Sequence, residues 1–261
     1  MRRLALIIII IALGSPIHSQ NYEFTFKITK DVAQTLYIGK YYKDSYIAID
    51  SATGDKGTYT FKGKQKWNKG VYGLFEKGAK KSVVDFTVDD SFKFTIEYDS
   101  TFNHAFTRIK GSTANKKMYE YIATLTKARA ESREIEKMKK SSDEATRAEA
   151  AQKSELLQKR MEKYEDSVFD ANSKYYFFNN LQKFKSPDVP DSLSQNDKAV
   201  YYREHYWDNI DLTDHSLVYT QDLFNKMNYY FFGLLYHAEF DTIAKYGDKV
   251  LSKVENDTLM L

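Results

Sequence analysis

Hydrophobic and polar residues alternate along the first part of the chain. In residues 22–28 and again in residues 92–98, every second residue is aromatic or aliphatic, and the residues between are charged or threonine. This period of two is typical of half-buried β-strands. The shorter runs LYIGKYY, TYTFKG, VYGLF and VVDFTV fit the same interpretation, with TGDKG, NKG and DDS as turns. The pattern predicts an antiparallel β-sandwich or partly open barrel over residues 20–112.

The hydrophobic period becomes helical after Ser112, which is placed to cap a helix. Ser141 and Glu144 have the spacing of a capping box and predict the start of a second helix. A stripe facing a partner helix then continues towards the helix-ending sequence SPDVP. Its members are Leu157, Met161, Tyr164, Val168, Ala171, Tyr175 and Phe178. These features predict a long helical hairpin over residues 113–185.

Further helices are expected over residues 192–261. One begins near Ser192 with Gln195 at the capping-box position, and two more cover about residues 220–238 and 241–255. The fold class is therefore α+β, with a β-rich domain over residues 20–112 and an all-α domain over residues 113–261.

The N-terminus reads MRRLALIIIIIALGSPIHSQ, with two arginines before an apolar run that a GSP sequence ends. This arrangement predicts a signal peptide over residues 1–19 and an exported, periplasmic or envelope-associated protein. A membrane anchor over residues 4–13 is the alternative, although the run is shorter than the roughly 20 residues of a membrane span. No transmembrane anchor is expected in the mature chain.

The amino-acid composition excludes several kinds of catalytic and metal site. The chain contains no cysteine, which excludes thiol catalysis, cysteine-ligated zinc and iron–sulfur clusters in these residues. It has 39 Lys and Arg against 36 Asp and Glu, and signal-peptide cleavage would remove Arg2 and Arg3. Nucleic-acid binding usually needs a basic excess, so none is expected. The 21 Tyr and 17 Phe supply large side chains for the cores.

Residues 205–226 concentrate carboxylates and histidines. Asp208, Asp211 and Asp214 are three residues apart, whereas a calcium loop of the EF-hand type places ligands at alternate positions. His205 and His215 lack the spacing of a helical zinc pair. We therefore expect Asp211 and Asp214 to cap backbone N–H groups between two helices, with a metal or acid–base role as the alternative.

Other chemical signals are weak. The chain has no GxSxG, HExxH or glycine-rich phosphate-loop sequence, and His104 and His237 stand isolated among aromatic residues. Trp67 and Trp207 could stack on sugars, but a core role is favoured. No catalytic, cofactor-binding or metal-binding residue is predicted, and no cofactor is expected.

Several segments carry a resemblance to a known family. IDSATGDKGTYTFKGK, NKGVYGLF, VVDFTVDDSFKFTIEYD and IKGSTANKKMYEYI resemble the β-rich N-terminal accessory domain of exported thioredoxin-like proteins of the TlpA type. YYREHYWDNIDLTDHSLVYTQDLFNKMNYYF and DTIAKYGDKVLSKV resemble the helical domain that precedes the thioredoxin fold in that family. The family's redox chemistry belongs to a Cys-x-x-Cys motif that this sequence lacks, so the resemblance implies an accessory role.

Three hypotheses follow for the function. The first is a non-catalytic exported module that binds a protein client, a partner or a second copy of itself. The second is a fragment of a longer redox protein whose Cys-x-x-Cys domain lies outside this sequence. The third is a glycan-binding envelope protein that uses Trp67 or Trp207.

Overall fold

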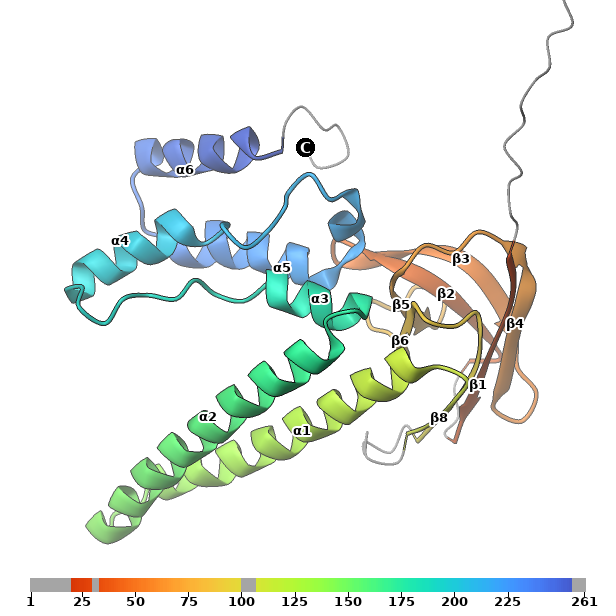
Figure 1. Cartoon of the computed structure of the whole chain (residues 1–261), viewed down its shortest axis with the longest axis horizontal. Coiled ribbons are helices and arrows are strands. Elements are labelled where there is room, and N and C mark those ends of the chain that lie inside the picture. The colour runs from red at the N-terminus through yellow and green to blue at the C-terminus, as the bar shows by residue number, and fades with distance from the viewer. Residues whose placement is uncertain (1–19, 30–32, 100–106, 255–261) are drawn as a thin grey trace, which may run out of the picture.

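The computed structural model describes residues 20–29, 33–99 and 107–254, so the predicted signal peptide over residues 1–19 lies outside the described residues. A β-sandwich is followed by a helical region (Figure 1), and the α+β fold class is confirmed. The last strand ends at Lys110 and the first helix begins at Thr113. The division into two domains at residues 112 and 113 stays a prediction.

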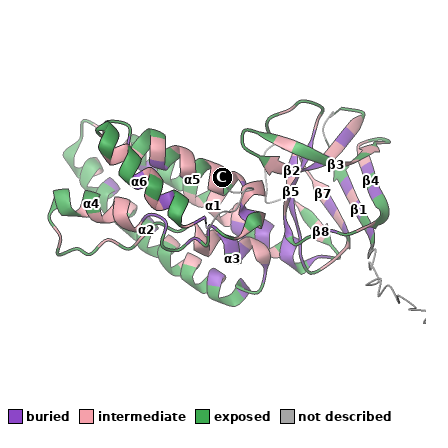
Figure 2. Ribbon diagram, turned by 90° about the horizontal axis from the view of Figure 1, so that it is seen from above, coloured by how far each residue is buried: buried purple, intermediate pink, exposed green. Residues whose placement is uncertain are grey.

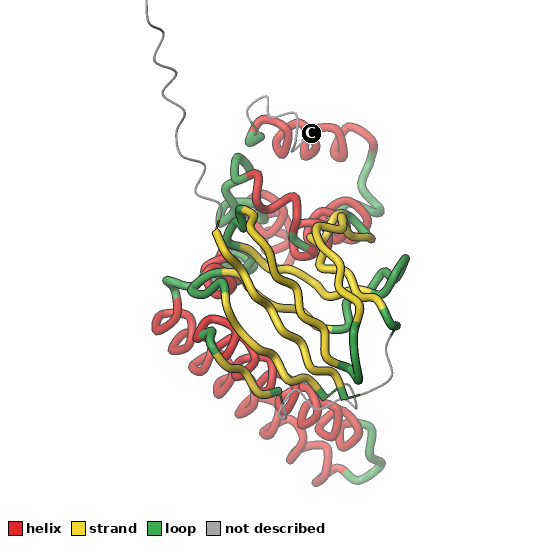
Figure 3. Tube along the Cα trace, turned by 90° about the vertical axis from the view of Figure 1, so that its right-hand side faces the viewer, coloured by secondary structure: helices red, strands yellow, loops and turns green. Residues whose placement is uncertain are grey.

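Eight strands form two four-stranded sheets, which Figure 3 shows in yellow. All pairings are antiparallel except that of β1 with β7, which is parallel and places Phe24 opposite Phe94. The first sheet has the order β4 (Thr58–Gln65), β1 (Gln20–Ile28), β7 (Lys93–Tyr98), β8 (Arg108–Lys110). The second has the order β3 (Ser45–Thr53), β2 (Thr35–Tyr42), β5 (Gly70–Phe75), β6 (Val84–Val88).

The sequence pattern did not predict β3 or β8. β3 is an edge strand whose Ile47 and Ile49 are exposed, so hydrophobicity does not separate a buried face from a solvated one. β8 has only three residues and pairs with β7 alone. Pairing with β2 stabilises β3, and pairing with β7 stabilises β8, although neither strand has a clear hydrophobic pattern in its sequence.

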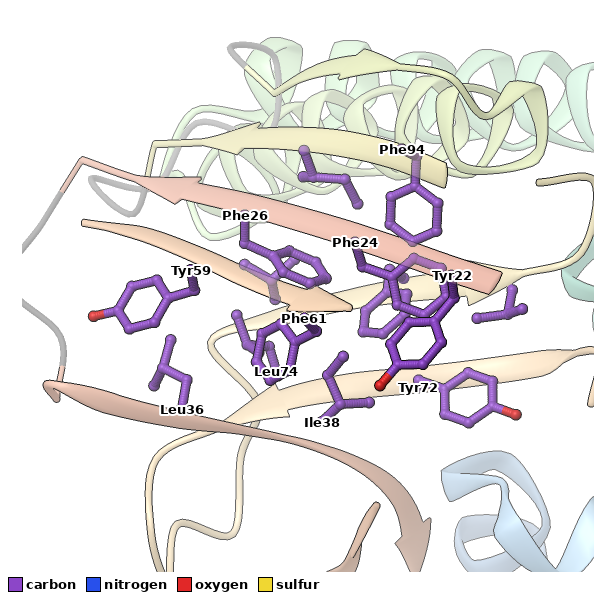
Figure 4. Packing of buried hydrophobic residues seen from close by; sticks show 14 of the residues in the cluster. Tyr22, Phe24, Phe26, Leu36, Ile38, Tyr59, Phe61, Tyr72, Leu74 and Phe94 are labelled. Atoms are coloured by element: carbon purple, nitrogen blue, oxygen red, sulfur yellow. The ribbon is translucent and has the colours of Figure 1, made fainter. Parts of the chain in front are cut away.

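Aromatic side chains fill the space between the two sheets (Figure 4). Phe24 stacks on Phe94 with ring centroids 4.5 Å apart. Trp67 is buried and its ring meets those of Phe24 and Tyr72 edge-on. Trp67 therefore belongs to the core, as the sequence favoured.

The first helix covers an open edge of the second sheet. Strand β6 ends this sheet, and its outward backbone groups are paired by side chains of α1 (Thr113–Lys139). Asn115 accepts from the Thr87 N–H at 2.8 Å and donates to the Thr87 carbonyl at 2.7 Å. One helical turn later, the Tyr119 hydroxyl donates to the Asp85 carbonyl at 2.8 Å. The side chains of α1 thus take the place of a further strand.

Helices α1 and α2 (Glu144–Asn172) form the predicted hairpin and run side by side away from the sandwich (Figure 1). Ser112 caps α1 as expected, accepting from the Asn115 N–H. The prediction that α2 starts at Ser141 is wrong by two residues. Asp143 is the cap, because its carboxylate accepts from both the N–H and the hydroxyl of Thr146. Much of the hairpin surface is exposed (Figure 2).

The second helix of the hairpin is shorter than the stripe predicts. α2 ends at Asn172, and a separate helix α3 (Tyr176–Lys183) follows a tight turn. The Tyr175 N–H donates to the Asn172 carbonyl within this turn, and the Tyr176 N–H donates to the carboxylate of Asp89 in the sandwich. The predicted hydrophobic stripe therefore extends past the end of α2 into α3. The chain changes direction between the two helices, where it contacts the sandwich.

The remaining helices form a second core around Trp207, Leu217 and Tyr230, all buried. Ser194, not Ser192, caps the first of them. Residues 230–234 widen into a π-helical turn, and the helix expected over residues 220–238 ends at Leu234. In the described part of the chain, no helix is both long and apolar enough to cross a membrane. The elements are α4 (Gln195–His205), η2 (His215–Tyr219), α5 (Gln221–Tyr229), η3 (Tyr230–Leu234) and α6 (Phe240–Ser252).

Candidate binding groove between the sandwich and the helices

Three adjoining cavities lie where the second sheet meets the helical region. Their volumes are about 150, 290 and 250 Å³, and Tyr219 lines all three. Strands β2 and β5 form one wall, while η2 and the start of α5 form the other. Ligand sites occur preferentially in clefts where different parts of a fold meet. We call these three cavities together the junction groove.

Capping interactions hold Tyr219 at the centre of the junction groove. Asp214 begins η2 by accepting from the Ser216 N–H at 3.0 Å. Thr220 ends η2 by donating to the Leu217 carbonyl and begins α5 by accepting from the Leu223 N–H. The interpretation of this stretch as a capped helix connection is therefore confirmed for Asp214.

The two cavities nearest β3 are lined by cationic and apolar side chains. The Lys40 ammonium group lies 4.8 Å from the ring centre of Tyr219 and 5.8 Å from that of Tyr72. Burial lowers the pKa of Lys40, and no ion pair joins it to a carboxylate among the described residues. Ile47 and Ile49 of β3, 46% and 36% exposed, line the outer cavity. This end of the groove combines an apolar strand edge with a positive charge over aromatic faces.

The third cavity carries the opposite charge, since both Asp85 and Asp222 line it. One oxygen of Asp85 accepts from the hydroxyls of Tyr41 and Ser82, each at 2.6 Å. Burial, reinforced by the charge of Asp85, raises the pKa of Tyr41 far above its usual range, so Tyr41 stays a hydrogen-bond donor.

Asp222 belongs to the first turn of α5 and reaches the same cavity. The residue is exposed to solvent at the surface, but partial loss of hydration at its carboxyl raises the pKa of that group, and the charge of Asp85 raises it further. It forms no hydrogen bond or ion pair with the described residues. Asp85 and Asp222 thus bring two carboxyl groups to one cavity.

The rest of this cavity is lined by apolar and polar side chains, among them one buried amide. Asn180 of α3 is 4% exposed, lines the cavity, and has no hydrogen-bond partner for its Oδ1 atom. An unpaired buried polar atom is costly, and such atoms in folded proteins call for a specific explanation. The apolar part of the lining comes from five side chains: Val71, Met118, Ile122, Phe177 and Leu181.

The acidic and histidine positions singled out in the sequence are mostly outside the junction groove. Asp208 pairs with His205 at 2.6 Å and with Lys253 at 3.5 Å. Asp211 accepts from Thr213 in a turn, as a loop-stabilising carboxylate does. Among residues 20–29, 33–99 and 107–254, no group of three or more potential ligand residues is placed to hold a metal ion.

Histidine and tryptophan positions divide between the groove, the surface and the core. His215 lines the smallest cavity of the junction groove, whereas His237 is exposed beside the ring of Tyr236. His104 lies outside the described residues. Trp207 is 2% exposed in the second core, and Trp67 lines the outer cavity of the junction groove from within the sandwich core.

The groove residues themselves carry little local signal in the sequence. Asp85 interrupts the apolar strand sequence VVDFTV, which hints that its side chain leaves the core. Asp222 looks like an ordinary acidic residue in the first turn of a helix. Asn180 sits within a helix and has no distinguishing spacing. Only the packing of the helices against the sheet brings the three together.

Comparison with known proteins gives one match. No curated protein and no solved structure matches this chain, and nothing found links it to thioredoxin-like proteins of the TlpA type. The one matching family model begins within α1 and covers the rest of the helical region, including the helical wall of the junction groove. Residues 130–261 match the family described as a domain of unknown function, DUF5106, and the chain therefore belongs to this family.

Proposed function

We propose that this chain is a non-catalytic, exported interaction module that holds an extended segment of a protein partner or client in the junction groove. The observation that carries the proposal is the groove itself, which the sandwich and the helices build together around Tyr219. A groove of this kind can bind a partner segment without catalysing a reaction, because its walls offer a complementary shape, apolar surface and charge.

The strand edge beside the groove supports an extended ligand. β3 ends its sheet, and its exposed Ile47 and Ile49 line the outer cavity. An extended peptide can add to such an edge through backbone hydrogen bonds while its side chains enter neighbouring pockets. The groove then supplies the pockets, and β3 supplies the backbone partner.

The place of this module in a cell is part of the proposal. The sequence of residues 1–19 favours export. The resemblance to TlpA-type accessory regions favours a module that presents a client to a separate thioredoxin fold. Thiol–disulfide exchange needs a thiolate, so this cysteine-free chain would contribute by binding alone. Sequencing the gene beyond the codon for Leu261 tests the fragment hypothesis, which an in-frame Cys-x-x-Cys domain would favour.

Selection from a displayed library of random heptapeptides against residues 20–261 tests the binding function. We expect enriched peptides whose affinity falls about tenfold on Tyr219→Ala or Ile47→Lys, as at central contacts of an interface. Tyr236→Ala and Val200→Lys are matched controls, because both residues are exposed and line none of the groove cavities. Enriched peptides that ignore both groove variants, or no enrichment at all, would contradict the proposal.

A further inference from the structure

We propose that the bound segment carries a glutamate whose carboxylate pairs with the ammonium group of Lys40 in the junction groove. This inference rests on the proposed function and adds the chemical identity of one ligand side chain. Lys40 lines both cavities nearest β3, whose volumes are about 150 and 290 Å³. Its ammonium group therefore borders the part of the groove that an extended segment beside Ile47 and Ile49 would occupy.

The charge of these two cavities is the first reason. No described aspartate or glutamate lines either of them, whereas three lysines do: Lys40, Lys66 and Lys69. Lys69 is already paired with Asp89 at 2.7 Å. Lys66 is exposed at the surface, where water and salt screen its charge. Lys40 is partly buried and forms no hydrogen bond or ion pair with the described residues, so it is the cation that the groove offers to a ligand.

The surroundings of the Lys40 ammonium group are the second reason. The faces of the Tyr72 and Tyr219 rings attract the cation, but a ring face does not replace an oxygen acceptor. Burial lowers the pKa of Lys40 by removing part of the water around its ammonium group. A ligand carboxylate would accept hydrogen bonds from this group and favour its charged form, which a cationic or apolar ligand side chain cannot do.

The strand register is the third reason, and it selects glutamate. Lys40 of β2 lies directly opposite Ile47 of β3, so the two side chains leave the same face of the sheet. A segment added to the edge of β3 would place its backbone about 10 Å from that of Lys40, twice the spacing between neighbouring strands. A residue opposite Ile47 then needs a long side chain to reach the lysine. Glutamate is one methylene group longer than aspartate and can pack that group against the isoleucine.

The test compares the heptapeptides that three forms of residues 20–261 select from the displayed library. The forms are the unchanged chain, Lys40→Met and Lys40→Glu. We expect the unchanged chain to enrich glutamate, and aspartate less, at one fixed position of the selected peptides. Lys40→Met should lose this preference, and Lys40→Glu should replace it by a preference for lysine or arginine. Lys64→Met is the matched control, because Lys64 is exposed on β4 and lines none of the groove cavities.

Synthetic peptides separate the charge of Lys40 from an effect on folding. A selected peptide and its analogue with glutamine in place of glutamate, both blocked at their ends, are titrated calorimetrically into each protein. The glutamine analogue should bind the unchanged chain about fivefold or more weakly, as loss of one partner of a partly buried ion pair does. Lys40→Met should bind the two peptides equally. It should also bind the glutamine analogue as well as the unchanged chain does, which shows that the groove is intact.

The outcomes separate the inference from the function beneath it. Selected peptides without an acidic preference, or with one that Lys40→Met retains, overturn the assignment to Lys40 but leave peptide binding standing. No enrichment by the unchanged chain contradicts the proposed function and the inference with it. The blocked ends exclude a terminal carboxylate as the ligand group. Free glutarate that binds as tightly as the selected peptide would reassign the site to small acids and overturn the proposal.

Discussion

The carboxylate of Asp89 accepts a hydrogen bond from the backbone N–H of Tyr176 at 2.5 Å, joining the end of β6 to the first residue of α3. The second oxygen of the carboxylate pairs with the Lys69 ammonium at 2.7 Å, and the Asp89 side chain is only 2% exposed. One buried carboxylate thus fixes the start of α3 to the sandwich. Because α3 supplies Asn180, this contact also positions a wall of the junction groove.

Asp89→Ala should lower the free energy of unfolding by about 1 to 3 kcal/mol, since it leaves the partly buried N–H of Tyr176 without an acceptor. Urea unfolding followed by circular dichroism measures the change. Asp44→Ala is the control, because Asp44 pairs with Lys80 on the surface and should cost less than about 1 kcal/mol. Equal effects of the two substitutions would contradict a special role for Asp89.

Glu204 should make the folding stability of the chain fall at acidic pH. Its carboxylate accepts from Lys249 at 2.6 Å and from Tyr246 at 2.9 Å, and these donors on α6 lower its pKa to about 2. An unfolded glutamate titrates near pH 4.3, so the stabilisation is complete above that pH and is lost as pH falls towards 2. Glu204→Gln should cost about 1 to 3 kcal/mol at pH 7.

The measurement for Glu204 is the difference in unfolding free energy between the unchanged chain and Glu204→Gln across this pH range. That difference should shrink between about pH 5 and pH 2. A difference that stays constant would mean that Glu204 acts through packing rather than through its charge.

Lys226 should also make stability rise with pH, but in the alkaline range. It is 8% exposed, its ammonium lies 4.3 Å from the ring centre of Tyr206, and burial lowers its pKa to about 8. Between pH 8 and the unfolded value near 10.4, the folded chain releases a proton that the unfolded chain keeps, so stability rises with pH.

Lys226→Met removes this titration. Relative to that variant, the unchanged chain should gain on the order of 2 kcal/mol between pH 7 and pH 10. Comparing the two proteins at each pH cancels the titration of the many tyrosines. Parallel stability profiles would show that the ammonium is stabilised as well in the folded chain as in water, for example by the Phe184 and Lys185 carbonyls at 3.4 Å.

Two neighbouring aspartates should differ in their contribution to stability. Asp214 caps η2 and also pairs with Lys183 at 3.2 Å, whereas Asp211 is exposed and holds only the local turn at Thr213. Asp214→Ala should cost about 1 to 2 kcal/mol and Asp211→Ala about 0.5 kcal/mol. Calorimetric titration with calcium or zinc should give no saturable heat. Micromolar binding abolished by either substitution would overturn the capping interpretation.

Hydrophobic period predicted most of the secondary structure, because burial on one face dominates strands such as β1 and helices such as α1. It failed where a contact distant in sequence decides the local structure. The break between α2 and α3 follows from Asp89, 87 residues before Tyr176, and no pattern near Asn172 announces it. The sequence DDS reads as a turn, yet its first residue is a buried anchor.

The candidate site was less predictable than the fold for a related reason. Local spacing can reveal ligands that share one loop or helix, as tested for Asp211 and Asp214. Asp85, Asn180 and Asp222 come from a strand and two separate helices, so no spacing connects them. Their shared cavity exists only after the helices pack on the sheet.

The pairing of β6 by side chains of α1 has a consequence for solubility. A strand with free N–H and C=O groups at the end of a sheet is a template on which another chain can add, the first step of aggregation. Asn115 and Tyr119 occupy those groups at Thr87 and Asp85. A chain in which α1 has not yet formed, as during synthesis or after proteolysis near Gly111, would therefore expose this edge and stack with its copies. By pairing the edge of β6, α1 keeps other chains from adding to this sheet.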